Sequence, residues 1–131
     1  MASYRLKPLV PGYAEGETVK VERLSFYGEV DPVKGELYDG RSIAGKILVI
    51  GRSRGSTVGS YIIYGLKYYG VEPKAIVMVK SEPIVVVGAV LAGIPLYEGL
   101  PREVFEKIRD GCTLRVRPTG EMELLECPTE G

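Results

Sequence analysis

The segment at residues 54–60 combines the residue types best suited to chemistry in this chain. It reads Arg-Gly-Ser-Thr-Val-Gly-Ser, after an apolar run at residues 46–50 typical of a buried strand and before a helix-like pattern at residues 61–69. Small residues between a strand and a helix aim backbone N–H groups and the positive end of the helix dipole at one point. Such a point suits a phosphate, a carboxylate or an alkoxide, and Ser56 lies inside the segment.

The same segment does not match two common active-site loops. Because the chain contains no histidine, a Ser-His-Asp hydrolase is excluded, and the string Gly55-Ser56-Thr57-Val58-Gly59 is not a Gly-x-Ser-x-Gly elbow. A Walker A loop would end in Gly-Lys-Ser or Gly-Lys-Thr, which is absent from this segment. Read alone, the segment is most simply a helix N-cap provided by Ser56 or Thr57.

Residues that hold metal ions are scarce. Histidine is absent, and the two cysteines, Cys112 and Cys127, are fewer than the three or four protein ligands of a zinc site or an iron–sulfur cluster. We therefore predict that this chain alone holds no metal, and we interpret both cysteines as packing residues. A disulfide between them is compatible with a thermophilic protein, but nothing in the sequence indicates one.

Length and charge limit the organisation of the chain and its partners. With 131 residues it is expected to form a single domain at residues 1–131, with a core at about residues 3–126 and a disordered tail at residues 127–131. Its 17 basic and 17 acidic residues leave no charge excess of the kind that binds nucleic acid or an anionic membrane. Since no apolar run approaches the ~20 residues of a membrane span and residues 1–7 lack a signal-peptide pattern, we expect a cytoplasmic protein.

The composition also points to a source at high temperature. Asn, Gln, His and Trp are absent, whereas Glu, Lys, Arg, Val and Ile are abundant. Hyperthermophile proteins are similarly poor in thermolabile amides and rich in charged residues.

Hydrophobic periodicity predicts an alternation of strands and helices. Strands are expected at residues 18–24, 36–38, 46–50, 74–80 and 94–97, with a hairpin at residues 112–116 and 121–125. Residues 26–35 are expected to form a loop. The result is a compact α/β domain with a mixed sheet or barrel-like β layer and two or three helices.

The helices are predicted from their apolar faces and end signals. One follows the Ser56 segment and has Val58, Ile62, Leu66 and Tyr69 on one apolar face; another spans residues 101–110. Residues 83–93 are apolar on all sides and fit either a strand or a helix, but their length and Pro83 favour a short buried helix.

Five segments, taken in order, add a more specific signal. They are residues 24–32 (Leu-Ser-Phe-Tyr-Gly-Glu-Val-Asp-Pro), 35–39 (Gly-Glu-Leu-Tyr-Asp), 48–50 (Leu-Val-Ile), 54–61 (Arg-Gly-Ser-Thr-Val-Gly-Ser-Tyr) and 82–89 (Glu-Pro-Ile-Val-Val-Val-Gly-Ala). Together they resemble the swivel domains of the aconitase X branch of the aconitase superfamily, in the detached form of the small subunits of archaeal phosphomevalonate dehydratases. The resemblance covers roughly residues 8–98.

The resemblance implies a fold, a reaction and a partner. The fold would be the swivelling β/β/α domain of the aconitase type, with a barrel-like mixed β layer. The reaction would be the hydro-lyase step of the archaeal mevalonate pathway that removes water from (R)-5-phosphomevalonate and gives trans-anhydromevalonate 5-phosphate. This chain alone would bind no cofactor, because a large aconitase-like partner subunit would carry a 4Fe–4S cluster, and the chain would be active only in a heterodimer or larger assembly.

The resemblance also implies roles for individual residues. Ser56 would be the catalytic proton acceptor, and the substrate would contact Arg54, Gly55, Thr57, Gly59 and Ser60. The chain departs from the family in two places: Ser53 precedes Arg54 where the family often has Gly-Arg-Gly-Ser, and Val58 replaces the aconitase-type arginine after the serine pair. Arg54 or the partner subunit must then supply the charge that anchors the substrate.

Elementary chemistry agrees with a serine in this role. Removing a proton α to a carboxylate requires a strong base, and positioned N–H donors at a helix N-terminus can stabilise an alkoxide. A site shared by two chains would lie where the Ser56 loop and the loop at residues 26–32 meet the partner. Two alternatives stay open: the swivel subunit of a related dehydratase, such as a cis-3-hydroxyproline dehydratase, and a non-catalytic anion-binding module.

Overall fold

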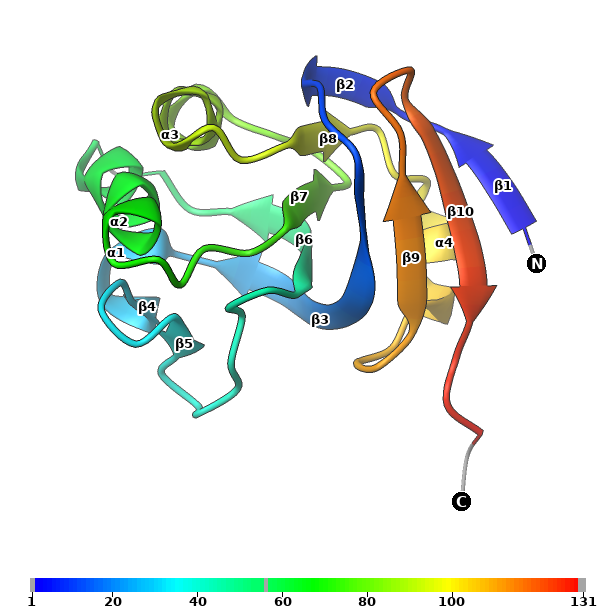
Figure 1. Ribbon diagram of the computed structural model, residues 1–131, viewed down its shortest axis with the longest axis horizontal. Helices are drawn as coiled ribbons and strands as arrows, with labels where there is room; N and C mark the ends of the chain where they lie inside the picture. The colour runs from blue at the N-terminus through cyan, green and yellow to red at the C-terminus, as the bar shows by residue number, and fades with distance from the viewer. Residues whose placement is uncertain (1, 56, 130–131) are drawn as a thin grey trace.

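A curved sheet forms the centre of the computed structural model, which describes residues 2–55 and 57–129. Within these residues the strand order is β1-β10-β9-β3-β6-β7-β8-β2 (Figure 1). The edge strands β1 and β2 are separated in the chain by Leu6 alone, so the two ends of the sheet lie near each other and the β layer is barrel-like, as predicted. The strands are β1 (Ala2–Arg5), β2 (Lys7–Val10), β3 (Ala14–Leu24), β6 (Ile47–Ser53), β7 (Ala75–Met78), β8 (Leu96–Glu98), β9 (Thr113–Val116) and β10 (Glu121–Glu126).

The long strand β3 joins two differently ordered parts of the sheet. Its first residues pair antiparallel with β9, whereas Thr18 and the residues that follow pair parallel with β6. Strand β6 pairs parallel with β7, and β7 with β8. Because parallel strands are covered on both faces, β6 and β7 read as continuous apolar runs in the sequence.

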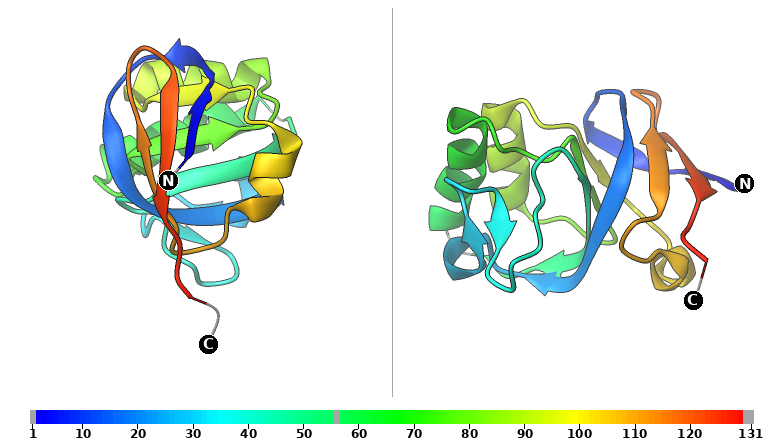
Figure 2. Two further views of the ribbon diagram at one scale, coloured as in Figure 1. Left: turned by 90° about the vertical axis from the view of Figure 1, so that its right-hand side faces the viewer. Right: turned by 60° about the horizontal axis from the view of Figure 1, so that its bottom comes forward.

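Helices cover both faces of the parallel strands. Helices α2 (Val58–Tyr68) and α3 (Pro83–Ala92), with the short α1 (Phe26–Glu29), cover one face, and α4 (Arg102–Lys107) lies on the other face with β9 and β10 (Figure 2). A small hairpin of β4 (Val30–Asp31) and β5 (Glu36–Leu37) leads from α1 toward β6. Along the part of the chain that the structure describes, no helix combines the length and apolar character that crossing a membrane requires.

Helix α2 forms where it was predicted, and its buried face matches the predicted one in part. Leu66 is buried as predicted and Ile62 packs against the core, but Val58 and Tyr69 are 40% and 51% exposed, and Ile63, which was not predicted, is buried. The cause is the close approach of α3: a Cβ on Gly88 would lie 2.8 Å from the Cδ1 atom of Ile63. This helix–helix contact, which no local pattern reveals, sets the rotation of α2.

The other predicted segments need smaller corrections. Residues 83–93 do form a helix, but only one face of α3 is buried, since Val87 and Leu91 are 49% and 60% exposed. The helix predicted at residues 101–110 is shorter, because Ile108 adopts extended backbone and buries its side chain. Residues 26–35 contain α1, whose Tyr27 and Gly28 have non-helical backbone angles, and β4.

The interpretation of the cysteines as packing residues was wrong. Cys112, just before β9, and Cys127, just after β10, form a disulfide. The Arg109 guanidinium also donates to the carbonyl of Pro128 at 2.6 Å. The start of the tail is therefore fixed, while residues 130–131 lie outside the described residues, so the disorder predicted there stays a prediction.

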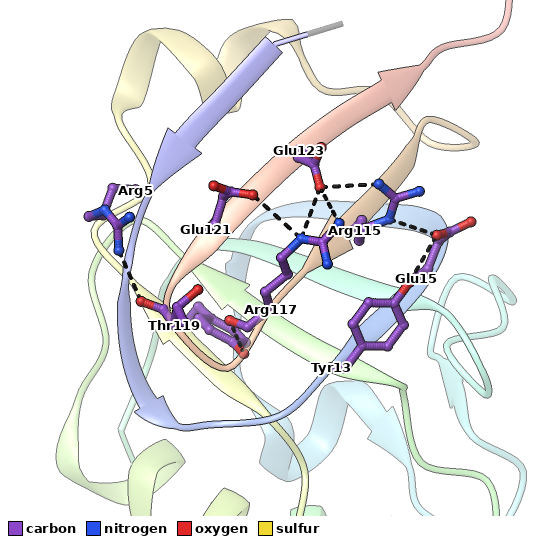
Figure 3. Close-up of polar contacts among 9 residues, drawn as sticks. Arg5, Tyr13, Glu15, Arg115, Arg117, Thr119, Glu121 and Glu123 are labelled. Atoms are coloured by element: carbon purple, nitrogen blue, oxygen red, sulfur yellow. Dashed lines mark hydrogen bonds and ion pairs between the residues drawn. The ribbon is translucent and has the colours of Figure 1, made fainter.

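The antiparallel strands hold their charges in ion pairs (Figure 3). Arg115 contacts Glu15 at 2.9 Å and Glu123 at 3.2 Å, and Arg117 contacts Glu121 at 3.4 Å and Glu123 at 3.2 Å. The hydrogen bond from Arg115, together with that from Arg117, holds the pKa of Glu123 below its ordinary value of 4.5.

Candidate active site at the carboxyl edge of the parallel strands

The parallel strands β3, β6, β7 and β8 end at one edge of the sheet, which we call the carboxyl edge. Four loops leave it: residues 25–29, 54–57, 79–82 and 99–101. Ligands of α/β sheets bind outside this kind of edge. Every site residue predicted from the sequence belongs to one of these loops or to the first turn of α2.

Ser56, the predicted proton acceptor, lies outside the described residues, but its neighbours are placed. The backbone N–H of Arg54 donates to the carbonyl of Leu24 at 2.9 Å and so joins the start of the loop to the end of β3. The Arg54 side chain is exposed and forms no hydrogen bond or ion pair with another described residue. Thr57 has helical backbone angles and occupies the N-cap position of α2.

Gly55 lies against a carboxylate that the sequence analysis did not single out. A Cβ on Gly55 would lie 3.0 and 3.2 Å from the two side-chain oxygens of Glu82. The backbone of Glu82 is fixed, because its carbonyl accepts hydrogen bonds from Val85 and Val86 at 3.1 and 3.2 Å. A side chain at position 55 would press on this carboxylate, so glycine allows the loop to pass close to it.

The first turn of α2 positions the remaining predicted residues. The Oγ of Ser60 donates to the carbonyl of Thr57 at 3.0 Å. Gly59 is buried, and a Cβ there would lie 3.4 Å from Ile84 and 3.7 Å from Phe26. Gly59 thus packs the start of α2 against α3 and α1, and it can offer a ligand only its backbone. Backbone N–H groups at a helix start favour an anion.

The loop after β3 is held by its own serine and glutamate. The backbone N–H of Ser25 donates to Oε1 of Glu29 at 2.7 Å, and the Oγ of Ser25 donates to the carbonyl of Tyr27 at 2.8 Å. Gly28 has a φ of 96°, in the left-handed region that favours glycine. Phe26 is buried and Tyr27 is 59% exposed. The Ser-Phe-Tyr-Gly-Glu motif is therefore a self-supporting turn that presents an aromatic ring at the carboxyl edge.

A second acid and hydroxyl pair joins the loops after β7 and β8. Ser81 donates to Oε1 of Glu98 from its hydroxyl and from its backbone N–H, the latter at 3.0 Å. These bonds, that of the hydroxyl first, hold the pKa of Glu98 below its ordinary value of 4.5. Glu98 is consequently an ionised anchor between two loops. Nothing in the sequence pattern singles out either residue, because they become neighbours only through the pairing of β7 with β8.

One buried polar atom at the base of the Ser56 loop lacks a partner. The Oγ of Ser53, the last residue of β6, is buried and has no hydrogen-bond partner among the described residues. A buried hydroxyl without a partner costs about 1–3 kcal/mol. The described part of the carboxyl edge therefore leaves this hydroxyl unsatisfied where the predicted catalytic loop begins.

The donor groups of this edge suit an anion rather than a metal. The described residues contain no group of three His, Cys, Asp or Glu side chains that could hold a metal ion. Both thiols are joined in the disulfide, so this chain offers no thiolate to an iron–sulfur cluster. The edge does offer a helix N-terminus, hydroxyl groups and the exposed Arg54, whose neighbour Gly55 lies against the Glu82 carboxylate. These groups can hold a negatively charged molecule at the loop that carries Ser56.

Comparisons with known proteins identify the family of the chain. A family model described as the aconitase X swivel domain matches residues 3–124. The phosphomevalonate dehydratase small subunit of Aeropyrum pernix is 57% identical over 122 residues, which cover 93% of this chain and 92% of the relative. That of Pyrococcus abyssi is 48% identical over 119 residues, which cover 85% of this chain and 89% of the relative.

A solved structure shows the same fold. The crystal structure of Thermococcus kodakaraensis aconitase X in its holo form matches with a TM-score of 0.90 and 42% identity, over 96% of this chain and 100% of that chain. The thermophilic archaeal sources of these relatives agree with the composition of the chain.

Proposed function

The chain belongs to the family of aconitase X swivel domains, and on this premise we propose that it is the small subunit of a two-subunit hydro-lyase. Its substrate is (R)-5-phosphomevalonate and its product trans-anhydromevalonate 5-phosphate, in line with the names of relatives that share up to 57% of their residues with it. The observation that carries the proposal is the convergence of the loops at residues 25–29 and 54–57 with the start of α3 at the carboxyl edge.

Ser56 acts as the base in this proposal. It accepts the proton from the carbon α to the substrate carboxylate, and the electron pair of that C–H bond forms the new double bond. The C–O bond at the β carbon breaks, and the hydroxyl leaves with its electron pair; solvent protonates it to water, and Ser56 returns its proton to solvent. Backbone N–H groups of the first turn of α2 stabilise the negative charge of the Ser56 alkoxide.

The residues around Ser56 hold the substrate and the loop. Arg54 supplies positive charge to the substrate carboxylate, and Gly55, Thr57, Gly59 and Ser60 line the contact with backbone groups and hydroxyls. Glu82 positions the loop through its close approach to Gly55. A 4Fe–4S cluster on the large partner subunit supplies a Lewis acid for the leaving hydroxyl. The shared site lies at the contact between that subunit and the carboxyl edge.

The proposal is tested by reconstitution. The chain is mixed with the large aconitase-like subunit from the same source, and each subunit alone serves as a control. We expect the pair to dehydrate 5-phosphomevalonate and the isolated chain to be inactive, because this chain has no free thiolate to hold a cluster. Turnover by the chain alone would contradict the shared site. Turnover of cis-3-hydroxyproline in preference to phosphomevalonate would show a related dehydratase instead.

A further inference from the structure

A recess of about 320 Å³ opens at the carboxyl edge, beside the start of α4. The ends of β3, β6 and β7 contribute most of its lining, and α4 contributes one residue. The lining residues are Glu22, Arg23, Gly51, Arg52, Val79, Lys80 and Arg102. None of them was singled out by the sequence analysis. The volume falls in the range of small-molecule sites.

Glu22, the one acidic residue among those that line the recess, is paired with Arg102. Both terminal nitrogens of Arg102 donate to the Glu22 carboxylate, one of them at 2.9 Å, and the Arg102 guanidinium lies 4.8 Å from the ring centroid of Phe105. The bond from Arg102 holds the pKa of Glu22 below its ordinary value of 4.5, and the charges of Arg52 and Arg23 act in the same direction. Glu22 and Arg102 therefore form a fixed wall with no net charge.

The other three cationic side chains are unpaired. Within the described ranges, the side chains of Arg23, Arg52 and Lys80 form no hydrogen bond and no ion pair. Arg23 and Arg52 are register partners on the neighbouring strands β3 and β6. Like charges on directly opposed residues of a sheet are destabilising. Three unpaired cations around one recess favour the binding of a compact anion with more than one charge.

The floor of the recess is kept open by glycine. A Cβ on Gly51 would lie 2.6 Å from the carbonyl oxygen of Glu22, so a side chain there would clash with the backbone of β3. The close approach of β3 and β6 at this point brings Arg23 and Arg52 together. The two arginines thus stand on rigid strands rather than on a loop.

We propose that this recess binds the phosphate monoester of the substrate, with Arg23, Arg52 and Lys80 as its ligands; the assignment rests on the function proposed above. Arginine guanidinium groups match phosphate oxygens in pairs. Arg52 precedes Ser56 by four residues, which span at most ~13 Å of extended chain. In this proposal the substrate places its phosphate in the recess and its reacting carbon at Ser56, and Arg54 remains available for its carboxylate.

The test uses the reconstituted pair and substitutions that remove one cation at a time. Arg52→Ala and Lys80→Ala are compared with Arg5→Ala, an exposed arginine on β1 whose side chain donates to the carbonyl of Thr119 (Figure 3). We expect Arg52→Ala to raise the KM for phosphomevalonate at least tenfold with less than a threefold change in kcat, and Arg52→Lys to restore part of the affinity. Inorganic phosphate should inhibit the wild type competitively and the Arg52→Ala pair much more weakly. The reconstituted pair that carries Arg5→Ala should match the wild-type pair in KM and in inhibition by phosphate.

The outcomes separate this inference from the proposed function. If the wild-type pair turns over phosphomevalonate and none of the recess variants changes KM, the phosphate subsite is overturned and the function stands. If the wild-type pair is inactive, calorimetry of phosphomevalonate with the pair decides: binding that requires Arg52 supports the recess, and binding unaffected by Arg52→Ala overturns it. If folded Arg52→Ala chains no longer pair with the large subunit on size exclusion, the cations bind the partner protein and the inference is overturned.

Discussion

Charge is arranged in opposite ways in the two parts of the sheet. In the antiparallel part, Arg115 and Arg117 each contact two carboxylates, and a disulfide closes the end of the chain onto β9. At the carboxyl edge of the parallel part, the side chains of Arg23, Arg52 and Lys80 form no ion pair with a described residue, and the Ser53 hydroxyl has no hydrogen-bond partner among the described residues. Among the described residues, the cations Arg115 and Arg117 of the antiparallel part are paired, whereas these three cations at the carboxyl edge form no ion pair, which fits the proposal that a substrate and a partner subunit bind at that edge.

The comparison predicts that substitutions at the carboxyl edge change turnover and substitutions in the antiparallel part change stability. The largest expected effect is that of Ser56→Ala in the reconstituted pair. If Ser56 is the base, its loss removes a proton-transfer contribution of about 10²–10⁴-fold in kcat. If it is only a helix cap, the loss costs about 1 kcal/mol of stability and little turnover. The kcat and the thermal midpoint are measured on the same preparation.

Matched controls for this substitution come from two hydroxyl residues that follow Ser56 in the chain. Thr57→Ala and Ser60→Ala remove hydroxyls that the proposal places at the substrate contact but not at the proton transfer, so we expect each to lower kcat far less than Ser56→Ala does. Near-normal kcat for Ser56→Ala with a lowered midpoint would place the base outside this loop.

The second prediction concerns the disulfide. Cys112 and Cys127 are 15 residues apart, and closing a loop of this length stabilises a fold by about 3 kcal/mol in the chain-entropy model. The double variant Cys112→Ala/Cys127→Ala should therefore melt roughly 10 °C lower, while kcat of the pair at a temperature well below the midpoint stays unchanged. Differential scanning calorimetry and the turnover assay measure the two effects. Reduced wild-type chain is the control and should melt near the double variant; a large loss of kcat would contradict the separation of the two parts.

The third prediction concerns Gly88, where a substitution should change both stability and turnover. A Cβ on Gly88 of α3 would lie 2.9 Å from the Cβ of Ile63 and 3.2 Å from the Cα of Ser60. Gly88→Ala should cost about 1–3 kcal/mol through overpacking. Since the displaced atoms belong to the first turns of α2, kcat should also fall. Chemical denaturation and the turnover assay are run in parallel.

Two further variants serve as controls for Gly88→Ala. Val87→Ala, next in the chain and 49% exposed, should change neither quantity. Ile63→Val in the Gly88→Ala background removes the Cδ1 atom that lies 2.8 Å from the new Cβ and should restore part of the stability. Full kcat in a destabilised Gly88→Ala pair would mean that the α2–α3 contact does not position the Ser56 loop.

Local sequence patterns predicted the elements of the parallel part well. The apolar run of β6, the small-residue loop after it and the helix that follows all form where expected, because strand burial, glycine and helix-end signals act within a few residues. The resemblance to aconitase X swivel domains, which rested on short motifs, also predicted the family of the chain, and the comparisons confirmed that family.

Contacts between distant residues could not be predicted in the same way. The buried face of α2 depends on Gly88, the role of Gly55 depends on Glu82, and the recess depends on the register between Arg23 and Arg52. The disulfide depends on the pairing of β9 with β10, which brings Cys112 and Cys127 together. Each of these relations appears only once the sheet order is known.

The smallest expected effect is a pH dependence that belongs to the antiparallel part. Glu123 accepts hydrogen bonds from Arg115 and Arg117, and its pKa in the folded chain is lowered from 4.5, chiefly by Arg115. A carboxylate with a lowered folded pKa adds stability above its ordinary pKa and loses it as the pH falls through the folded value. The thermal midpoint of Glu123→Gln should thus lie slightly below that of the wild type at pH 7, and the gap should close below pH 4.5. Glu103→Gln, whose carboxylate forms no ion pair with a described residue, should show no such closing gap. A midpoint difference between Glu123→Gln and the wild type that stays constant from pH 7 to pH 3 would mean that packing, rather than charge, accounts for the contribution of Glu123. The ion pairs of the antiparallel part would then not be what distinguishes it from the carboxyl edge.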